Sequence, residues 1–379
     1  MTDFHLTRRS LVGTSLAMTT LAATGTAAFA EPVGKAPARP AKPLVIGHRG
    51  ASALRPEHTL ASYAKAIEDG ADFIEPDLVA TSDGVLIARH ENAITETTDV
   101  ADHPEFADRK TTKIIDGESL TGWFSEDFTL AEIKTLRAKE RLGPLRPESH
   151  GYNGQFQIVT LEEIADFVAA EAAARGRMIG MIPEIKHSSY FSEIGLPLEQ
   201  RLLDRIDASA YLQTAPLIIQ SFEVSNLKWL RPRIAGQANI ELLQLTMPID
   251  VRPPDLFRRG EGPTYNEMHA PRGLAELATY ADWLSPWNVA LLGRDKDENL
   301  LDTPTGLTEN AHQAGLKVST WTFRPENYFL PRQMRSEAGD GARNVDGSIA
   351  EIRRYLALGI DSFFTDDPAI GRMAVDGNT

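Results

Sequence analysis

The feature that most constrains the fold is a regular alternation of short apolar runs with longer segments of helical periodicity. Short runs rich in Val, Ile and Leu predict buried β-strands, and helices between them predict parallel strands joined by crossover connections. Eight strands are predicted, over Leu44–Gly47, Ala71–Val79, Met178–Ile185, Pro216–Gln220, Ile240–Leu245, Trp283–Ser285, Lys317–Trp321 and Ser362–Thr365. Helices are predicted over Thr59–Glu68, Leu161–Arg175, Leu198–Ile206, Leu274–Tyr280, Thr308–Ala314 and Ser348–Leu358.

Eight strands with intervening helices fit a TIM (β/α)8 barrel, which typically takes about 250 residues plus insertions. The alternative is an open doubly wound sheet, but no glycine-rich phosphate motif follows the first predicted strand. The surplus length follows predicted strands, at about 90–157, 246–271 and 324–346. On a barrel these loops lie at the C-terminal face, where active sites are found. The segment at about 91–157, after the second strand, is predicted to be an inserted cap.

The first 43 residues are predicted to lie outside the folded domain, which is expected to cover 44–379. Residues 1–30 combine Arg8 and Arg9, a mildly apolar stretch and the small-residue sequence 28–30, the layout of a twin-arginine signal peptide. An ordinary N-terminal helix is the alternative. Residues 31–43 are a Pro/Ala tether too rich in proline for a helix. We expect export by the twin-arginine machinery, a periplasmic or secreted location, and no stable membrane anchor.

Composition narrows the chemistry that this chain can perform. Its 39 basic and 53 acidic side chains give a net charge of −14, and cysteine is absent. The negative charge argues against nucleic acid as a partner, because a polyanion would repel the protein. Without cysteine, thiolate metal sites and cysteine nucleophiles are excluded. A metal would therefore be bound by oxygen or histidine ligands.

Chemically capable side chains gather where the first two strands are predicted to end. His48 titrates near neutral pH, and Arg49 offers a forked cation suited to phosphate oxygens. Glu75 and Asp77 lie two residues apart on a strand, so both side chains face the same side. Two carboxylates on an apolar strand are costly unless they are neutralised. This predicts a hard divalent cation; a salt bridge to buried basic residues is the alternative.

The third strand and a short run before it complete this group. Glu184 is positioned to add a third carboxylate, and Lys186, two residues later, to meet a substrate anion. A turn over residues 81–84, followed by a short strand over 84–90, is expected to bring His90 back beside the carboxylates. His48 and His90 then fit a general acid and base, and the whole group predicts phosphoester chemistry. Two residues at late strand ends are expected to line the pocket, Gln220 and Trp321. The other histidines of the predicted domain have no partner pattern and are expected at the surface: His103, His150, His187, His269 and His312.

Several short sequence segments occur in a fixed order, and their combination is highly specific for one protein family. They are Gly47-His48-Arg49-Gly50, Pro56-Glu57-His58-Thr59, Phe73-Ile74-Glu75-Pro76-Asp77-Leu78, Val85 to His90, Thr97-Thr98-Asp99-Val100, Asp127-Phe128-Thr129-Leu130, Pro183-Glu184-Ile185-Lys186 and Phe364-Thr365-Asp366. In these segments the chain resembles the glycerophosphodiester phosphodiesterase family, specifically its periplasmic bacterial branch.

The resemblance implies a TIM barrel with an inserted cap that hydrolyses deacylated phospholipids to glycerol 3-phosphate and an alcohol. It also implies one divalent cation, calcium in preference to magnesium. Carried over to this chain, the acid–base pair is His48 and His90. The metal ligands are Glu75, Asp77 and Glu184, and the phosphate contacts are Arg49 and Lys186. The nucleophile is either a neighbouring glycerol hydroxyl, giving a cyclic phosphate, or water.

One position departs from the family pattern, which usually has asparagine where this chain has His58. Histidine keeps a hydrogen-bonding side chain but changes its reach and adds a titratable group. Two other functions remain open. A phospholipase D-like lipase of the same barrel would act on lysolipids or sphingolipids, and a solute-binding barrel would have no turnover.

Overall fold

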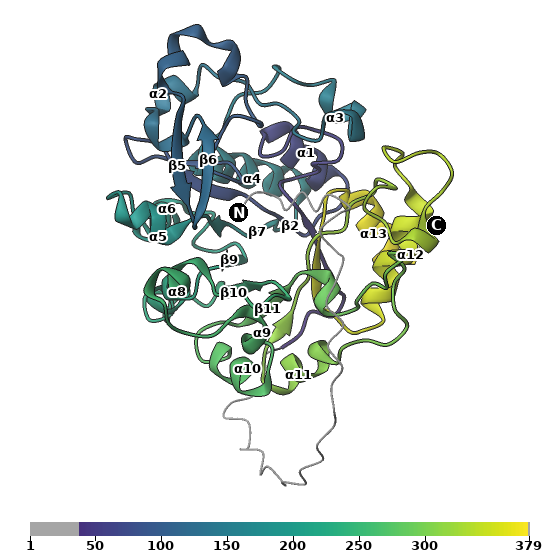
Figure 1. Ribbon diagram of the computed structural model, residues 1–379. Helices are drawn as coiled ribbons and strands as arrows, with labels where there is room; N and C mark the ends of the chain where they lie inside the picture. The colour runs from purple at the N-terminus through teal and green to yellow at the C-terminus, as the bar shows by residue number, and fades with distance from the viewer. Residues whose placement is uncertain (1–37, 378–379) are drawn as a thin grey trace.

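The computed structural model describes residues 38–377, so the predicted signal peptide and most of the tether lie outside the described residues. None of the helices between residues 38 and 377 has the length and apolar character that crossing a membrane would require. The described chain alternates strands with helices, and the helices surround the strands (Figure 1).

Eight parallel strands make up the main path of the described sheet, in the order β12-β11-β10-β9-β7-β2-β1-β13. They are β1 (Leu44–Gly47), β2 (Phe73–Ile74), β7 (Gly180–Met181), β9 (Leu217–Ser221), β10 (Ile240–Thr246), β11 (Trp283–Pro286), β12 (Lys317–Val318) and β13 (Ser362–Thr365). Within this set of eight, each strand lies beside the one that precedes or follows it along the chain, and β1 also lies beside β13. The amides of Asp361 and Phe364 donate to the carbonyls of Val318 (2.7 Å) and Thr320 (2.9 Å). These bonds link β12 and the residues just after it to β13. The architecture is the predicted TIM barrel.

Helices follow the strands on the outside of the barrel. They are α1 (Leu60–Glu68), α4 (Leu161–Arg175), α5 (Ser188–Glu193), α6 (Leu198–Ala208), α7 (Ser225–Leu230), α8 (Pro254–Arg259), α9 (Tyr265–Met268), α10 (Pro271–Leu277), α11 (Leu307–Gln313), α12 (Val345–Leu356) and α13 (Pro368–Asp376). At the start of α4, Thr160 accepts from the Glu163 amide (3.1 Å) while the Glu163 carboxylate accepts from the Thr160 amide (2.8 Å). This reciprocal cap satisfies two amides that the helix itself leaves unpaired. Helix α10 begins earlier than predicted because Pro271 suits a first helical position, where no amide is needed.

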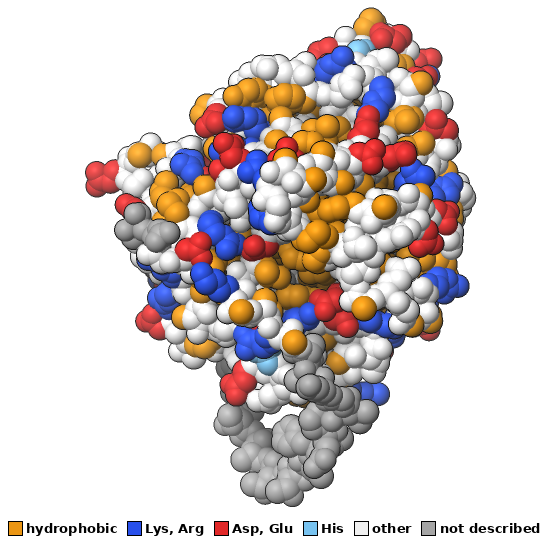
Figure 2. Space-filling model, turned by 180° about the vertical axis from the view of Figure 1, so that it is seen from behind, with side chains coloured by type: hydrophobic (Ala, Val, Ile, Leu, Met, Phe, Trp, Pro, Cys, Tyr) orange, Lys and Arg blue, Asp and Glu red, His pale blue; other side chains and the backbone are white. Residues whose placement is uncertain are grey.

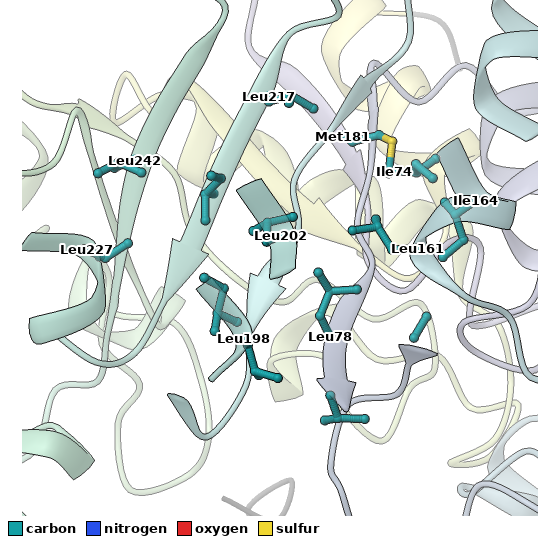
Figure 3. Close-up of a cluster of buried hydrophobic side chains, with 14 of the residues drawn as sticks. Ile74, Leu78, Leu161, Ile164, Met181, Leu198, Leu202, Leu217, Leu227 and Leu242 are labelled. Atoms are coloured by element: carbon teal, nitrogen blue, oxygen red, sulfur yellow. The ribbon is translucent and has the colours of Figure 1, made fainter. Parts of the chain in front are cut away.

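Alternate residues of the strands pack into two separate hydrophobic cores, one between the strands and the helices and one inside the barrel. Val45, Leu217 and Leu242 pack outward against the helices. Their neighbours Ile46, Ile218 and Leu243 belong to a second cluster, which fills the barrel interior. Figure 3 shows the outer core, where leucines of α4, α6 and α7 meet strand residues such as Ile74 and Met181. Because side chains alternate along a strand, this split fixes which residues point inward.

The second and third predicted strands, each expected to be continuous, are interrupted by proline. Residues 71–79 divide at Pro76 into β2 and β3 (Asp77–Ala80), and residues 178–185 divide at Pro183 into β7 and β8 (Glu184–Ile185). Proline has no amide to donate, so the ladder breaks there. Beyond the break, β3 pairs in parallel with β8, which sets Asp77 directly opposite Glu184. On its other edge β3 pairs antiparallel with β4 (Leu86–Ala88).

The chain between β4 and α4 forms a separate layer, drawn in blue at the top of Figure 1. We call residues 91–157 the cap. It holds a hairpin of β5 (Thr111–Ile115) and β6 (Glu118–Gly122), the short helices α2 (Leu130–Ile133) and α3 (Pro147–His150), and 3-10 turns at Val100–Asp102, Pro104–Arg109, Ser125–Asp127 and Gly143–Leu145. Trp123, Phe124 and Phe128 are buried within it and form part of its core.

The surface seen in Figure 2, from behind the view of Figure 1, mixes basic and acidic side chains around a central area of apolar ones. The net charge of −14 is therefore not gathered into one acidic patch on this face. Such a mixed surface provides no strong field of a single sign there.

Candidate active site

The alternation of the strands aims the predicted site residues at one place. Three interior residues each precede a site residue by two positions: Ile46 precedes His48, Phe73 precedes Glu75, and Ile182 precedes Glu184. Residues two apart on a strand share a face, so these polar side chains continue the inward row beyond the carboxyl ends of the strands. At this end of a TIM barrel, side chains from different strands converge on a common site.

The three predicted carboxylates lie together. Glu75, Asp77 and Glu184 are buried, and one oxygen from each lies within 4.8 Å of the others. Lys186 Nζ is 2.8 Å from Glu184 Oε2 and 3.7 Å from Asp77 Oδ1. Among the described residues, Asp77 Oδ1 is buried without a hydrogen-bond partner. The cluster therefore offers three inward-facing oxygen donors.

The electrostatics of the cluster favour a cation. Burial, reinforced by the charge of Asp77, raises the pKa of Glu75 well above its usual range. Burial also raises the pKa of Glu184 to about 8. Burial opposes ionisation of Asp77 too, but Lys186 and His58 hold its pKa well below normal. The raised pKa values of Glu75 and Glu184 beside the ionised Asp77 indicate that the site lacks enough positive charge to stabilise three carboxylates. A hard divalent cation would supply that charge and is suited to oxygen ligands.

His48 is held by a carboxylate on β13. Its Nδ1 lies 2.5 Å from Asp366 Oδ1, and its Nε2 lies 3.8 Å from Glu75 Oε2. Burial lowers the pKa of His48, although Asp366 partly opposes the shift. The lowered pKa favours the neutral ring, in which Asp366 accepts the Nδ1 proton and Nε2 faces Glu75.

His90 is also held by a carboxylate. Its Nδ1 lies 2.5 Å from Glu91 Oε1, and the side chain keeps 13% of its surface exposed. Burial and then the charge of Arg49 lower the pKa of His90 to about 3. The charge of Lys186 lowers this pKa further.

Arg49 is packed among carboxylates. Its Nη1 lies 3.0 Å from Glu57 Oε2, its Nε lies 3.7 Å from Asp77 Oδ2, and its amide donates to Glu75 Oε2 at 2.9 Å. Glu57 also pairs with Arg141 of the cap. The structure thus brings Arg49 into the predicted site and gives it a further contact, with the carboxylate cluster itself.

The two predicted pocket residues differ in position. Gln220 has no exposed surface, and its Nε2 donates to Glu75 Oε1 at 2.8 Å, so it supports the cluster from within the barrel. Trp321 is half-buried and donates to the Ser285 carbonyl at 3.1 Å. Its ring stacks on Trp287 with centroids 6.2 Å apart, at the end of the barrel strands.

Four charged residues that hold the histidines and join the cap to the barrel were not predicted from the sequence. Glu91 and Asp366 bind the histidine rings, and Arg141 and Arg146 of the cap bind these two carboxylates in turn. Arg141 and Arg146 also line a small pocket together with His48. Asp366 had a signal, because it follows the inward-facing Phe364 by two positions. The cap arginines had none, because their partners are distant in the sequence.

The expectation that His187 lies at the surface is wrong. Its side chain is buried, and its Nδ1 lies 2.7 Å from Asp116 Oδ2 at the tip of the β5–β6 hairpin. The hairpin folds onto the loop after β8 and covers the ring. His269 and His312 are half-buried and bonded to Thr246 and Asp361, whereas His150 is exposed as predicted.

Comparison with known proteins agrees with this geometry. Residues 48–370 match the model of the glycerophosphoryl diester phosphodiesterase family. A glycerophosphodiester phosphodiesterase of Arabidopsis thaliana is 33% identical over 345 residues, covering 88% of this chain and 86% of the plant protein. That of Haemophilus influenzae is 28% identical over 338 residues, covering 84% and 89%.

Solved structures share the fold. A Silicibacter pomeroyi protein has a TM-score of 0.60 at 21% identity, over 89% of this chain and 95% of its own. An Oleispira antarctica phosphodiesterase, solved in complex with the product sn-glycerol-3-phosphate, has a TM-score of 0.55 at 19% identity, over 88% and 97%. With the family match over most of the chain, the predicted enzyme class is confirmed. The chain belongs to the glycerophosphoryl diester phosphodiesterase family.

Proposed function

We propose that this enzyme hydrolyses glycerophosphodiesters to glycerol 3-phosphate and an alcohol, with one divalent cation in its site. The observation that carries the proposal is the buried cluster of Glu75, Asp77 and Glu184 flanked by two histidines, each held through Nδ1 by a carboxylate. The names of the plant and bacterial relatives support the substrate class. So does the product bound to the Oleispira antarctica protein.

The chain's own residues account for the proton transfers. A histidine whose Nδ1 donates to a carboxylate presents a basic Nε2 to the substrate. One of His48 and His90 takes the proton of the attacking group, which is either water or the hydroxyl on the neighbouring glycerol carbon. The other must enter the step as an imidazolium, protonated at both ring nitrogens, and it donates its Nε2 proton to the departing alcohol oxygen. The two histidines thereby exchange protonation states, and the protein gains no net proton. Lys186 and Arg49 supply positive charge for the phosphate oxygens.

The cation would be held by Glu75, Asp77 and Glu184, and when bound it supplies charge stabilisation to the phosphoryl oxygens. We propose calcium in preference to magnesium. Calcium accepts irregular sets of carboxylate oxygens, whereas magnesium demands near-octahedral geometry and retains its water.

The test uses the mature protein and glycerophosphocholine, with glycerol 3-phosphate as the measured product. We expect product formation to stop in chelator and to return when calcium, or less effectively magnesium, is restored. Activity that persists unchanged in excess chelator would contradict the cation. Failure with every ion, together with cleavage of lysolipids, would favour the phospholipase D-like alternative. Failure on lysolipids as well would favour a barrel without turnover.

We also propose that the protein belongs to the periplasmic bacterial branch of the family and is exported. The support is the twin-arginine pattern of residues 1–30, which lie outside the described residues.

A further inference from the structure

A buried row of three side chains leads from α1 to the carboxylate cluster. His58 has no exposed surface; its Nε2 lies 2.9 Å from Asp77 Oδ2, and its Nδ1 lies 2.9 Å from the Tyr63 hydroxyl. Tyr63 belongs to α1 and is also fully buried. A polar row enclosed in this way contributes to specificity only if each member has a partner.

The protons of this row follow from what each group can donate. An ionised carboxylate only accepts, so the hydrogen bond to Asp77 requires the proton on His58 Nε2. The neutral ring then accepts at Nδ1, and the Tyr63 hydroxyl is the donor. Asp77 Oδ2 is thereby engaged, whereas Asp77 Oδ1 is left without a hydrogen-bond partner in the described chain. The two oxygens of one carboxylate are thus assigned different tasks.

The backbone holds His58 in the conformation that this contact needs. Its φ of 56° lies in the left-handed region, which few residues other than Gly, Asn, Asp and His enter readily. Its amide donates to the Arg49 carbonyl at 3.1 Å, and its own carbonyl accepts from Arg89 Nη2 at 3.0 Å. Arg89 is fully buried. The loop is therefore fixed on both sides of the residue.

We propose that His58 is a positioning residue that orients the Asp77 carboxylate, so that Oδ1 is presented to the cation while Tyr63 sets the tautomer of the ring. This proposal rests on the cation site of the proposed function. A carboxylate ligand that loses its outer hydrogen bond is free to rotate, and loss of such a partner typically weakens metal binding about 10- to 100-fold. Because the His58 side chain contacts the carboxylate cluster through Asp77, its removal lowers cation affinity and leaves the chemistry intact once the cation is saturating.

The test measures calcium affinity by calorimetric titration of protein stripped of cations. His58→Ala removes the donor, and we expect affinity about 10- to 100-fold weaker. His58→Gln keeps an N–H at a similar reach and should restore most of the affinity. Tyr63→Phe removes only the donor to Nδ1 and should weaken binding less than His58→Ala does. His312→Ala is the matched control, because its Nε2 also lies 2.9 Å from an aspartate, Asp361, which precedes β13 at the opposite end of the barrel.

The outcomes separate this role from the proposed function. Calcium affinity in His58→Ala within twofold of wild type would overturn the role of His58 while leaving the cation site in place. Loss of turnover that persists at saturating calcium would also overturn it, since it would make His58 catalytic. Wild-type protein that binds neither calcium nor magnesium would overturn the cation site itself and the role of His58 with it. Should His58→Ala fail to fold by circular dichroism, Tyr63→Phe and His58→Gln decide, and unchanged affinity in Tyr63→Phe would then count against the proposal.

Discussion

At the scale of single residues, the two histidines of the site share one arrangement built from unrelated parts of the chain. Asp366 comes from the end of β13, and Glu91 directly follows His90. In both cases a carboxylate accepts the proton on Nδ1, and for His48 the other nitrogen, Nε2, faces Glu75. Because both rings have this contact, the geometry supports His48 and His90 as a pair of proton carriers and does not distinguish the acid from the base.

Replacing His48 or His90 by alanine tests the pair. Each substitution removes one proton carrier, so kcat for glycerophosphodiester hydrolysis should fall about 100-fold or more. His150→Ala, at an exposed position of the cap, is the control and should leave the rate unchanged. Steady-state rates at saturating substrate and calcium provide the measurement. Losses below tenfold in both site variants would exclude this acid–base pair.

The convergence of the three carboxylates could be predicted from the spacing of residues in the sequence. The two-residue spacing of Glu75 with Asp77, and of Glu184 with Lys186, predicted shared faces. The structure brings the three carboxylates within 4.8 Å. The assignment did not require a continuous strand, because Pro76 interrupts β2 and β3 and the carboxylates still converge. What spacing could not reveal was that His58, treated only as a departure from a pattern, contacts Asp77 directly.

At the scale of elements, cap and barrel are joined by a buried ion network as well as by apolar contacts. Arg146 precedes α3 in the cap; its Nε lies 2.8 Å from Glu326 Oε1, and it also pairs with Asp366. All three side chains are almost fully buried. The same Asp366 holds His48, so the seating of the cap and the orientation of a site histidine depend on one carboxylate.

Arg146→Met should therefore destabilise the protein strongly. It leaves Asp366 and Glu326 buried without their main counter-charge, and breaking such a pair costs about 3–5 kcal/mol. Arg55→Met is the matched control, because Arg55 also bridges barrel and cap but pairs with the exposed Glu148, a contact worth about 1 kcal/mol at most. Denaturant unfolding of both variants checks the difference. Adding Glu326→Gln to Arg146→Met should recover part of the loss, and equal stability of the two single variants would contradict the argument.

At the scale of the whole molecule, the 340 residues that the structure describes, 38–377, form one barrel with its cap, and the predicted signal peptide precedes them in the sequence. A twin-arginine signal is read by a receptor rather than inserted as an anchor, so its function depends on the arginine pair itself. Replacing both Arg8 and Arg9 by lysine should keep the unprocessed protein in the cytoplasm of a host that has this pathway. Cell fractionation and the mass of the product provide the measurement. Lys35→Arg, just beyond the predicted cleavage site, is the control, and unimpaired export of the double variant would contradict the signal type.

The sequence by itself determined the features that depend on local periodicity. Alternation of strands and helices predicts the barrel, and a spacing of two aims Glu75 and Glu184 inward. The Thr160–Glu163 cap marks where α4 begins, because each of these signals acts within a few residues. Only the tertiary structure decided the features that depend on contacts between distant segments. The cap supplies Arg141 and Arg146, β13 supplies Asp366, and a hairpin tip buries His187. Such pairings are set by how the cap packs on the barrel and, apart from the position of Asp366, no local pattern in the chain indicates them.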